Sequence, residues 1–135
     1  QNSFVAQFIG ENNRLQGRVK QVSGKVATVE LEGGGSVTAE AVNVGADGTP
    51  TTLSLRPERV EIEPKKGSLP NILSGEIREL IYLGDHIRTR MRVAGNEEFI
   101  VKVPNSAGNK PLAEGATVTI GWKSEDCKAL DPLAA

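Results

Sequence analysis

Aromatic residues, cysteine, histidine and methionine are all scarce in this sequence. Only 4% of its 135 residues are aromatic, so a hydrophobic core must be built mainly from Val, Ile, Leu and Ala. The single cysteine, Cys127, excludes an intramolecular disulfide and favours a reducing compartment. With His86 as the only histidine, the chain has too few of the usual ligands for a zinc site, and we expect no metal. We expect His86 at a surface turn and Cys127 in the core.

An excess of charge of one sign and long apolar runs are also missing. The 16 basic and 17 acidic residues leave a net charge of −1, which gives no long-range attraction for nucleic acid or anionic membranes. Tyr82 and Trp122 are isolated, whereas single-strand binding surfaces group aromatic residues in a basic groove. No stretch approaches the roughly 20 apolar residues of a membrane helix, and no signal peptide is visible. We therefore expect neither nucleic-acid binding nor direct membrane insertion.

The sequence contains none of the residue patterns that carry catalysis. The run Gly33-Gly34-Gly35 is not followed by the lysine of a phosphate-binding loop, so it predicts a hairpin turn. Glu58, Glu61 and Glu63 alternate with apolar residues, which predicts a strand with one solvent-exposed face and not a catalytic acid/base pair. We expect no catalytic and no cofactor-binding residue, and this chain is not predicted to be an enzyme.

Apolar periodicity predicts one helix followed by strands. Ser3–Gly10 has apolar residues at helical spacing, with a serine that can cap its start and a glycine that can end it. From Leu15 onward the period is two, which is typical of strands. Short strands at this spacing favour small barrels or sandwiches. The predicted strands are Leu15–Gln21, Val26–Glu32, Val37–Val44, Thr51–Arg56, Ile72–Tyr82, His86–Val93, Glu98–Val103 and Ala116–Trp122.

An internal repeat organises these strands into two similar halves. Residues 13–20 (Asn-Arg-Leu-Gln-Gly-Arg-Val-Lys) match 71–78 (Asn-Ile-Leu-Ser-Gly-Glu-Ile-Arg), and 53–60 match 120–127 in the same order. Chance similarity between alternating strands is the alternative, but glycine and charged positions match as well as apolar ones. The predicted fold is all-β, with duplicated small barrels after a short N-terminal helix. The predicted segments are a helical lead-in (1–12), a first repeat (13–62), a linker (63–70) and a second repeat (71–135).

Three stretches of the sequence resemble a known family. Residues 4–13 resemble the segment that leaves the nucleotide-binding domain in ATPase subunits of ABC importers. Residues 55–60, with Arg56-Pro57-Glu58, resemble the Arg-Pro-Glu motif of their C-terminal domain, and residues 82–85, with Gly84, resemble a later loop of it. This is the TOBE family of transport-associated barrels similar to oligonucleotide/oligosaccharide-binding (OB) folds, and the resemblance covers essentially the whole chain.

The resemblance implies a regulatory and dimerisation role beside a missing ATPase domain. The only methionine is Met91, so we expect this chain to be a fragment or a processed product. The missing domain would bind ATP and Mg²⁺ and power import of a polyamine, ferric iron or a sugar, the start of the chain favouring polyamine or iron. The implied partners are a second copy of the same subunit and the transporter's membrane subunits, on the cytoplasmic side of a bacterial inner membrane. No cofactor is expected in this chain.

Two alternatives stay open from the residues themselves. Arg56 and Glu58 flank Pro57, which ends a strand. They can have a structural role, in which they satisfy loop carbonyls and amides or pair with each other, or they can make a regulatory or ligand contact. The alternative function is a sensor of small oxyanions bound between the two repeats. That function needs a cluster of hydroxyl and basic groups, and no dense cluster is apparent in the sequence.

Overall fold

The computed structural model describes residues 12–105 and 111–132. These residues form ten strands and two 3-10 helices, so the predicted all-β class is confirmed. The predicted helix over Ser3–Gly10 lies outside the described residues. None of the described segments is a helix long and apolar enough to cross a bilayer. The strands are β1 (Asn13–Ser23), β2 (Val26–Leu31), β3 (Ser36–Ala41), β4 (Pro50–Leu55), β5 (Glu61–Ile62), β6 (Asn71–Leu83), β7 (His86–Val93), β8 (Asn96–Pro104), β9 (Thr117–Trp122) and β10 (Cys127–Leu130), and the 3-10 helices are η1 (Pro57–Arg59) and η2 (Ser124–Asp126).

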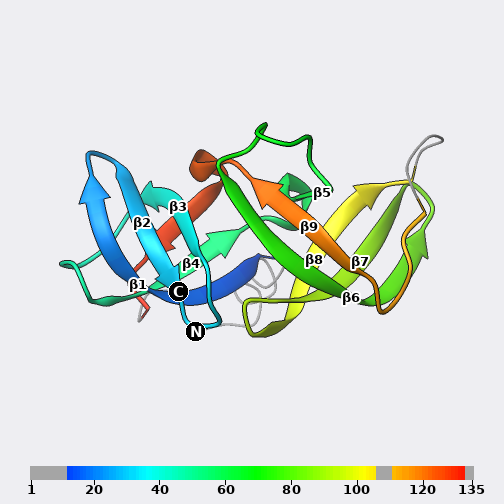
Figure 1. The fold of residues 1–135 in the computed structure, drawn as a ribbon, viewed down its shortest axis with the longest axis horizontal. Coiled ribbons are helices and arrows are strands. Elements are labelled where there is room, and N and C mark those ends of the chain that lie inside the picture. The colour runs from blue at the N-terminus through cyan, green and yellow to red at the C-terminus, as the bar shows by residue number, and fades with distance from the viewer. Residues whose placement is uncertain (1–11, 106–110, 133–135) are drawn as a thin grey trace, which may run out of the picture.

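One end of the molecule is a small closed barrel, on the left in Figure 1, in the order β1-β2-β3-β10-β4. Its neighbouring strands are antiparallel, except that β10 runs parallel to β3. Along β1, Asn13, Leu15, Gly17 and Val19 are buried, and the residues between them are half-buried or exposed. This alternation places one face of the strand in the core, as the period-two pattern predicts.

The other end is an open five-stranded sheet in the order β5-β9-β6-β7-β8, on the right in Figure 1. All its neighbours are antiparallel. β1 and β6 each contain a bulge, between Val19 and Gln21 and between Ile77 and Glu79, at the same place in the two halves. A bulge adds local twist, which curls each long strand around its own half of the core.

The two halves exchange their last strands. Each half runs through four strands, a 3-10 helix and a short fifth strand. The fifth strand of the first half, β5, pairs with β9 in the open sheet, whereas β10 pairs with β4 and β3 in the barrel. The segments 13–62 and 71–135 therefore do not each complete a sheet of their own, and their division into two repeat domains stays a prediction.

Two buried asparagines, Asn13 and Asn71, fasten the halves together. The Asn13 amide donates to the backbone carbonyl of Ile100 on β8 and accepts from its N–H, both at 2.7 Å. Asn71 forms the same pair with the carbonyl and N–H of Thr38 on β3, both at 2.8 Å. Each asparagine is the first residue of the first strand in one half, and its side-chain amide bonds to a backbone N–H and carbonyl in the third strand of the other half. The amide thus gives these backbone groups the hydrogen-bond partners that a neighbouring strand would otherwise supply.

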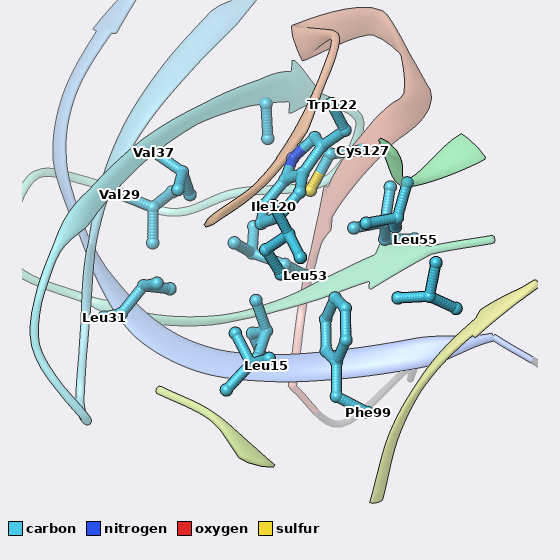
Figure 2. Packing of buried hydrophobic residues seen from close by; sticks show 14 of the residues in the cluster. Leu15, Val29, Leu31, Val37, Leu53, Leu55, Phe99, Ile120, Trp122 and Cys127 are labelled. Atoms are coloured by element: carbon cyan, nitrogen blue, oxygen red, sulfur yellow. The ribbon is translucent and has the colours of Figure 1, made fainter. Parts of the chain in front are cut away.

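A single hydrophobic core runs through both sheets (Figure 2). Phe99 on β8 and Trp122 on β9 are fully buried, with ring centroids 6.2 Å apart. Leu53 and Leu55 from β4 and Cys127 from β10 are equally buried in the same cluster. Because residues of both sheets share this core, each half buries more surface than a unit of its size could bury alone.

The turns and the Pro57 region decide where the predicted strands end. Gly33-Gly34-Gly35 lies in the turn between β2 and β3, and β4 stops at Leu55 before Pro57, as predicted. The predicted strand containing Glu58, Glu61 and Glu63 is wrong, because Glu58 belongs to η1 and β5 has only two residues. Pro57 stands at the start of η1, where its fixed φ suits a helical turn. Glu63 then leaves the strand with φ of 52°.

Candidate functional site

The Arg-Pro-Glu motif forms the sharp connection between β4 and β5. Arg56 is extended (φ −74°, ψ 137°), as expected before a proline, and Pro57 is buried as the first residue of η1. The Arg59 N–H donates to the Arg56 carbonyl at 3.0 Å and closes the turn. Arg56 and Glu58 are exposed, and among the described residues neither side chain has a hydrogen bond or ion pair, so the choice between a structural role and a regulatory contact for them stays a prediction.

A surface pocket of about 380 Å³ opens beside this motif. Lys128 in it is already occupied, because its ammonium contacts Glu40 and donates to the Glu125 carbonyl at 3.0 Å. Arg56 and Arg59 have no ion pair within residues 12–105 and 111–132. The pocket therefore has two guanidinium groups available for an acidic group, opposed by two carboxylates of η2. Its lining residues are Asn12, Ser54, Arg56, Arg59, Glu125, Asp126 and Lys128.

Two further pockets lie on either side of the point where the β2–β3 turn of the first half touches the β7–β8 turn of the second half. The Gly33 backbone lies against Ala94, where a Cβ on Gly33 would come within 2.2 Å of the Ala94 carbonyl carbon. The pocket on one side, about 620 Å³, contains Arg14, Glu32 and Glu98, and the one on the other side, about 450 Å³, contains Glu76, Arg92 and Glu97. Carboxylates in both pockets repel an oxyanion at neutral pH.

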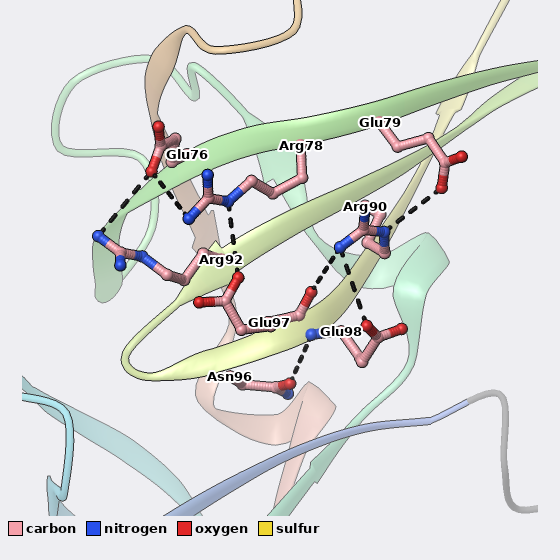
Figure 3. Close-up of polar contacts among 8 residues, drawn as sticks. All are labelled: Glu76, Arg78, Glu79, Arg90, Arg92, Asn96, Glu97 and Glu98. Carbon is pink, nitrogen blue, oxygen red and sulfur yellow. Dashed lines mark hydrogen bonds and ion pairs between the residues drawn. The ribbon is translucent and has the colours of Figure 1, made fainter.

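The outer face of β6, β7 and β8 carries an ion-pair network (Figure 3). Arg78 lies 3.5 Å from both Glu76 and Glu97, and Arg90 lies 3.3 Å from Glu79. Arg92 and Glu98 extend the network with contacts of 3.8 Å to Glu76 and Arg90, respectively. Because acids and bases alternate across neighbouring strands, this face presents no run of single-sign charge.

Gly84 lies in the turn of the β6–β7 hairpin, in the loop that resembles the family motif. Its φ of 70° is a conformation that glycine adopts without strain. Tyr82 and Leu83 before it are 62% and 45% exposed. His86 Nδ1 lies 2.8 Å from Asp85 Oδ1, and this hydrogen bond lowers the pKa of the Asp85 carboxyl. The family-motif residues thus lie at two separate places, Arg56-Pro57-Glu58 beside η1 and Gly84 at the hairpin tip.

Cys127 is a core residue, as predicted. Its side chain is fully buried, and burial raises the pKa of the thiol to about 12, so it is neutral and unsuited to nucleophilic attack. His86 starts β7 and its side chain is 29% exposed. Within the described part of the chain, no three His, Cys, Asp or Glu residues gather as a metal site would require.

Sequence reasoning missed three residues that matter in this structure. Asn13 and Asn71 head the two matching segments of the repeat, and this shared position was the available signal for their common role. Arg59 follows the recognised motif directly but matches an acid, Asp126, in the other half. That mismatch marks the pocket beside η1 as a feature of one half only.

Comparison with known proteins identifies the family. The sequence matches the TOBE domain over residues 53–130, which is more than half of the chain. The chain belongs to the TOBE domain family. The match includes the Arg-Pro-Glu segment, both exchanged strands and the Gly84 turn.

Curated relatives of this TOBE protein are import ATP-binding proteins. It is 34% identical over 126 residues to the spermidine/putrescine import ATP-binding protein PotA of Chromobacterium violaceum, covering 90% of this chain and 35% of the relative. It is 32% identical over 122 residues to the Fe(3+) ions import ATP-binding protein FbpC 1 of Rhizobium meliloti, covering 90% and 32%. The chain thus spans about a third of the length of the curated relatives it matches.

A solved structure confirms the architecture. The cytoplasmic molybdate-binding protein ModG, crystallised with molybdate bound, matches with a TM-score of 0.71 over 89% of this chain and 96% of that protein. The sequence identity is 21%, so this likeness concerns the fold. It supports the predicted barrels of the TOBE type.

Proposed function

We propose that this chain is the non-catalytic C-terminal regulatory and dimerisation domain of an ABC-transporter ATP-binding subunit that powers solute import. The observation that carries the proposal is the match to import ATP-binding proteins, which covers 90% of this chain but only 35% of the Chromobacterium violaceum relative. In this proposal the rest of the subunit binds ATP and Mg²⁺. The partners are a second copy of the subunit and the transporter's membrane subunits, on the cytoplasmic face of the bacterial inner membrane.

The proposed cargo is a polyamine or ferric iron. The names of the matched relatives, spermidine/putrescine and Fe(3+) import proteins, support this choice over a sugar.

A domain exchange tests the proposal. The region of the Chromobacterium violaceum PotA protein that aligns with this chain is replaced by this chain, and ATPase activity and spermidine uptake are measured in the reconstituted transporter. The matched control is the same subunit with the region deleted. We expect the exchanged subunit to restore regulated transport relative to the deletion.

Two outcomes would contradict the proposal. An exchanged subunit that assembles but behaves like the deletion would remove the regulatory role. Binding of ATP to this chain by calorimetry at micromolar affinity would contradict its non-catalytic character, since the sequence has no phosphate-binding loop. Circular dichroism must first show that the subunit carrying the exchanged domain is soluble and folded, so that a loss of regulation is not a loss of folding.

A second candidate function is the sensing of a small oxyanion. Two observations favour it: the fold likeness to a molybdate-binding protein and the unpaired guanidinium groups of Arg56 and Arg59. Calorimetry with molybdate and sulfate, on this chain and on its Arg56→Ala/Arg59→Ala variant, separates the two functions. Binding that the double substitution abolishes supports sensing at this pocket, and no binding by the unaltered chain removes it.

A further inference from the structure

The pocket of about 620 Å³ at the junction of the halves has walls that hydrogen bonds hold in place. Its walls are the start of β1, the β2–β3 turn and the β7–β8 turn. The Glu32 N–H donates to the Gln16 carbonyl at 2.9 Å, which ties the β2–β3 turn to β1. The Asn96 amide donates to the Arg14 carbonyl and accepts from the Glu98 N–H, both at 2.8 Å, and Figure 3 shows the second bond. The pocket is therefore preorganised, which lowers the cost of binding a ligand.

Arg14 supplies an unpaired guanidinium to this pocket. Its Nε is buried and has no hydrogen-bond partner among the described residues. Its terminal nitrogens have no partner within residues 12–105 and 111–132 either, and they are not among the buried atoms, so they are accessible from the pocket. Arg18, further along the outer face of β1, donates to the Gly48 carbonyl instead. A partly covered guanidinium binds a carboxylate well, because its planar fork forms two parallel hydrogen bonds.

Two carboxylates line the same pocket on either side of Arg14. Glu32 has no ion pair with another described residue. Glu98 is 78% exposed, and its one ion pair in the described part of the chain is a contact of 3.8 Å to Arg90. One guanidinium and two carboxylates thus line the pocket without closing on one another. The molecule that complements them has one acidic group and two cationic groups.

We propose that this pocket binds a free α-amino acid with a basic side chain, such as lysine or arginine. The α-carboxylate pairs with Arg14, and the α-ammonium pairs with Glu98. The side-chain cation pairs with Glu32, which lies beyond Gln16. Positions two apart on a strand are separated by roughly 7 Å, so a long unbranched side chain is needed to span this face. The inference goes beyond the proposed function and holds whether or not the chain regulates an importer.

Titration of the unaltered chain with lysine tests the site. Amide chemical shifts of the isotope-labelled protein report both the affinity and the place of binding. We expect saturable shifts at Gly33, Gly95 and Asn96, with a Kd of about 1 mM or tighter.

Three analogues of lysine test the ligand class. Norleucine lacks the side-chain ammonium, and cadaverine lacks the carboxylate. Nα-acetyl-lysine lacks the α-ammonium and imitates the C-terminal residue of a peptide. Each should bind at least about fivefold more weakly than lysine, because it leaves one charged group of the pocket without a partner.

Substitutions in the pocket assign the contacts. Arg14→Gln should weaken lysine binding at least about tenfold, because it removes the bidentate partner of the carboxylate. Glu32→Gln should weaken lysine binding about fivefold and leave norleucine binding unchanged. Arg18→Gln and Glu30→Gln are the matched controls, because these exposed residues lie opposite each other on β1 and β2 but do not line the pocket. Neither control should change lysine binding.

The outcomes separate this site from the proposed function. Lysine that causes no saturable shifts, or shifts only at another surface, overturns the site. Cadaverine that binds as tightly as lysine, or an Arg14→Gln variant with undiminished lysine binding, overturns the amino-acid class, and Nα-acetyl-lysine that binds as tightly overturns the contact with Glu98. None of these results bears on the role in import, which the domain exchange tests separately.

Discussion

The contact between Asn13 and Ile100 allows a quantitative prediction. Asn13 is 3% exposed, and its amide makes two backbone hydrogen bonds of 2.7 Å across the junction of the halves. Asn13→Ala removes both bonds and leaves a buried N–H and a buried carbonyl of Ile100 without partners. An unsatisfied buried group costs about 1–3 kcal/mol, so we expect the substitution to lower the free energy of unfolding by about 3 kcal/mol.

The matching contact in the other half should be weaker. Asn71 makes the same two bonds and a third to the Thr38 hydroxyl, but Thr38 is only half-buried, so water can replace part of what is lost. We expect Asn71→Ala to cost about 2 kcal/mol. Urea denaturation followed by circular dichroism measures both values, provided that the slope of the transition is unchanged.

Asn105→Ala is the control for the asparagine substitutions. Asn105 also donates from its amide to a backbone carbonyl, that of Gly84 at 3.2 Å, but the contact is exposed. It should change the free energy of unfolding by less than about 0.5 kcal/mol. If Asn13→Ala cost no more than Asn105→Ala, the view that these amides fasten the two halves would be wrong.

Three further predictions concern the thiol, a close backbone contact and the surface ion pairs. The raised pKa of Cys127 keeps the thiol protonated in the folded state, while the unfolded chain releases that proton above about pH 9. Stability should therefore fall with rising pH above that point, by up to about 1.4 kcal/mol per pH unit, and Cys127→Ala should lack this component in urea titrations at pH 8 and 10. Gly33→Ala should destabilise the fold by about 1–3 kcal/mol, because its Cβ meets the Ala94 backbone, and equal melting temperatures for the variant and the unaltered protein would contradict that steric account. Glu76→Gln should cost less than about 1 kcal/mol, and the difference should shrink in 1 M salt; a large, salt-independent loss would indicate a role beyond exposed ion pairs.

Local pattern accounts for most of the strands. Alternation of apolar and polar residues placed the long strands, because side chains on a strand point to opposite faces with a period of two. The match of Cys127 to Val60 in the internal repeat placed the cysteine in the core. Pro57 and Gly33-Gly34-Gly35 marked boundaries because their backbone preferences are local. The family was also readable in the sequence, from motifs that occur in a fixed order.

Pairing over long sequence distances could not be read in the same way. The exchange of β5 and β10 joins residues that are far apart in the chain, and a two-residue strand such as Glu61–Ile62 carries too little pattern to predict its partner.

The sequence by itself thus determined the fold class, the strands and the family, whereas the tertiary structure decided how the two halves are joined. Strand patterns depend on neighbours within a few residues, so they can be read directly from the sequence. The roles of Asn13 and Asn71 depend on which backbone groups of the other half lack a strand neighbour. Which backbone groups these are is decided only when the sheets have formed, because the folded chain determines which polar groups lie within hydrogen-bond distance of a buried N–H or carbonyl.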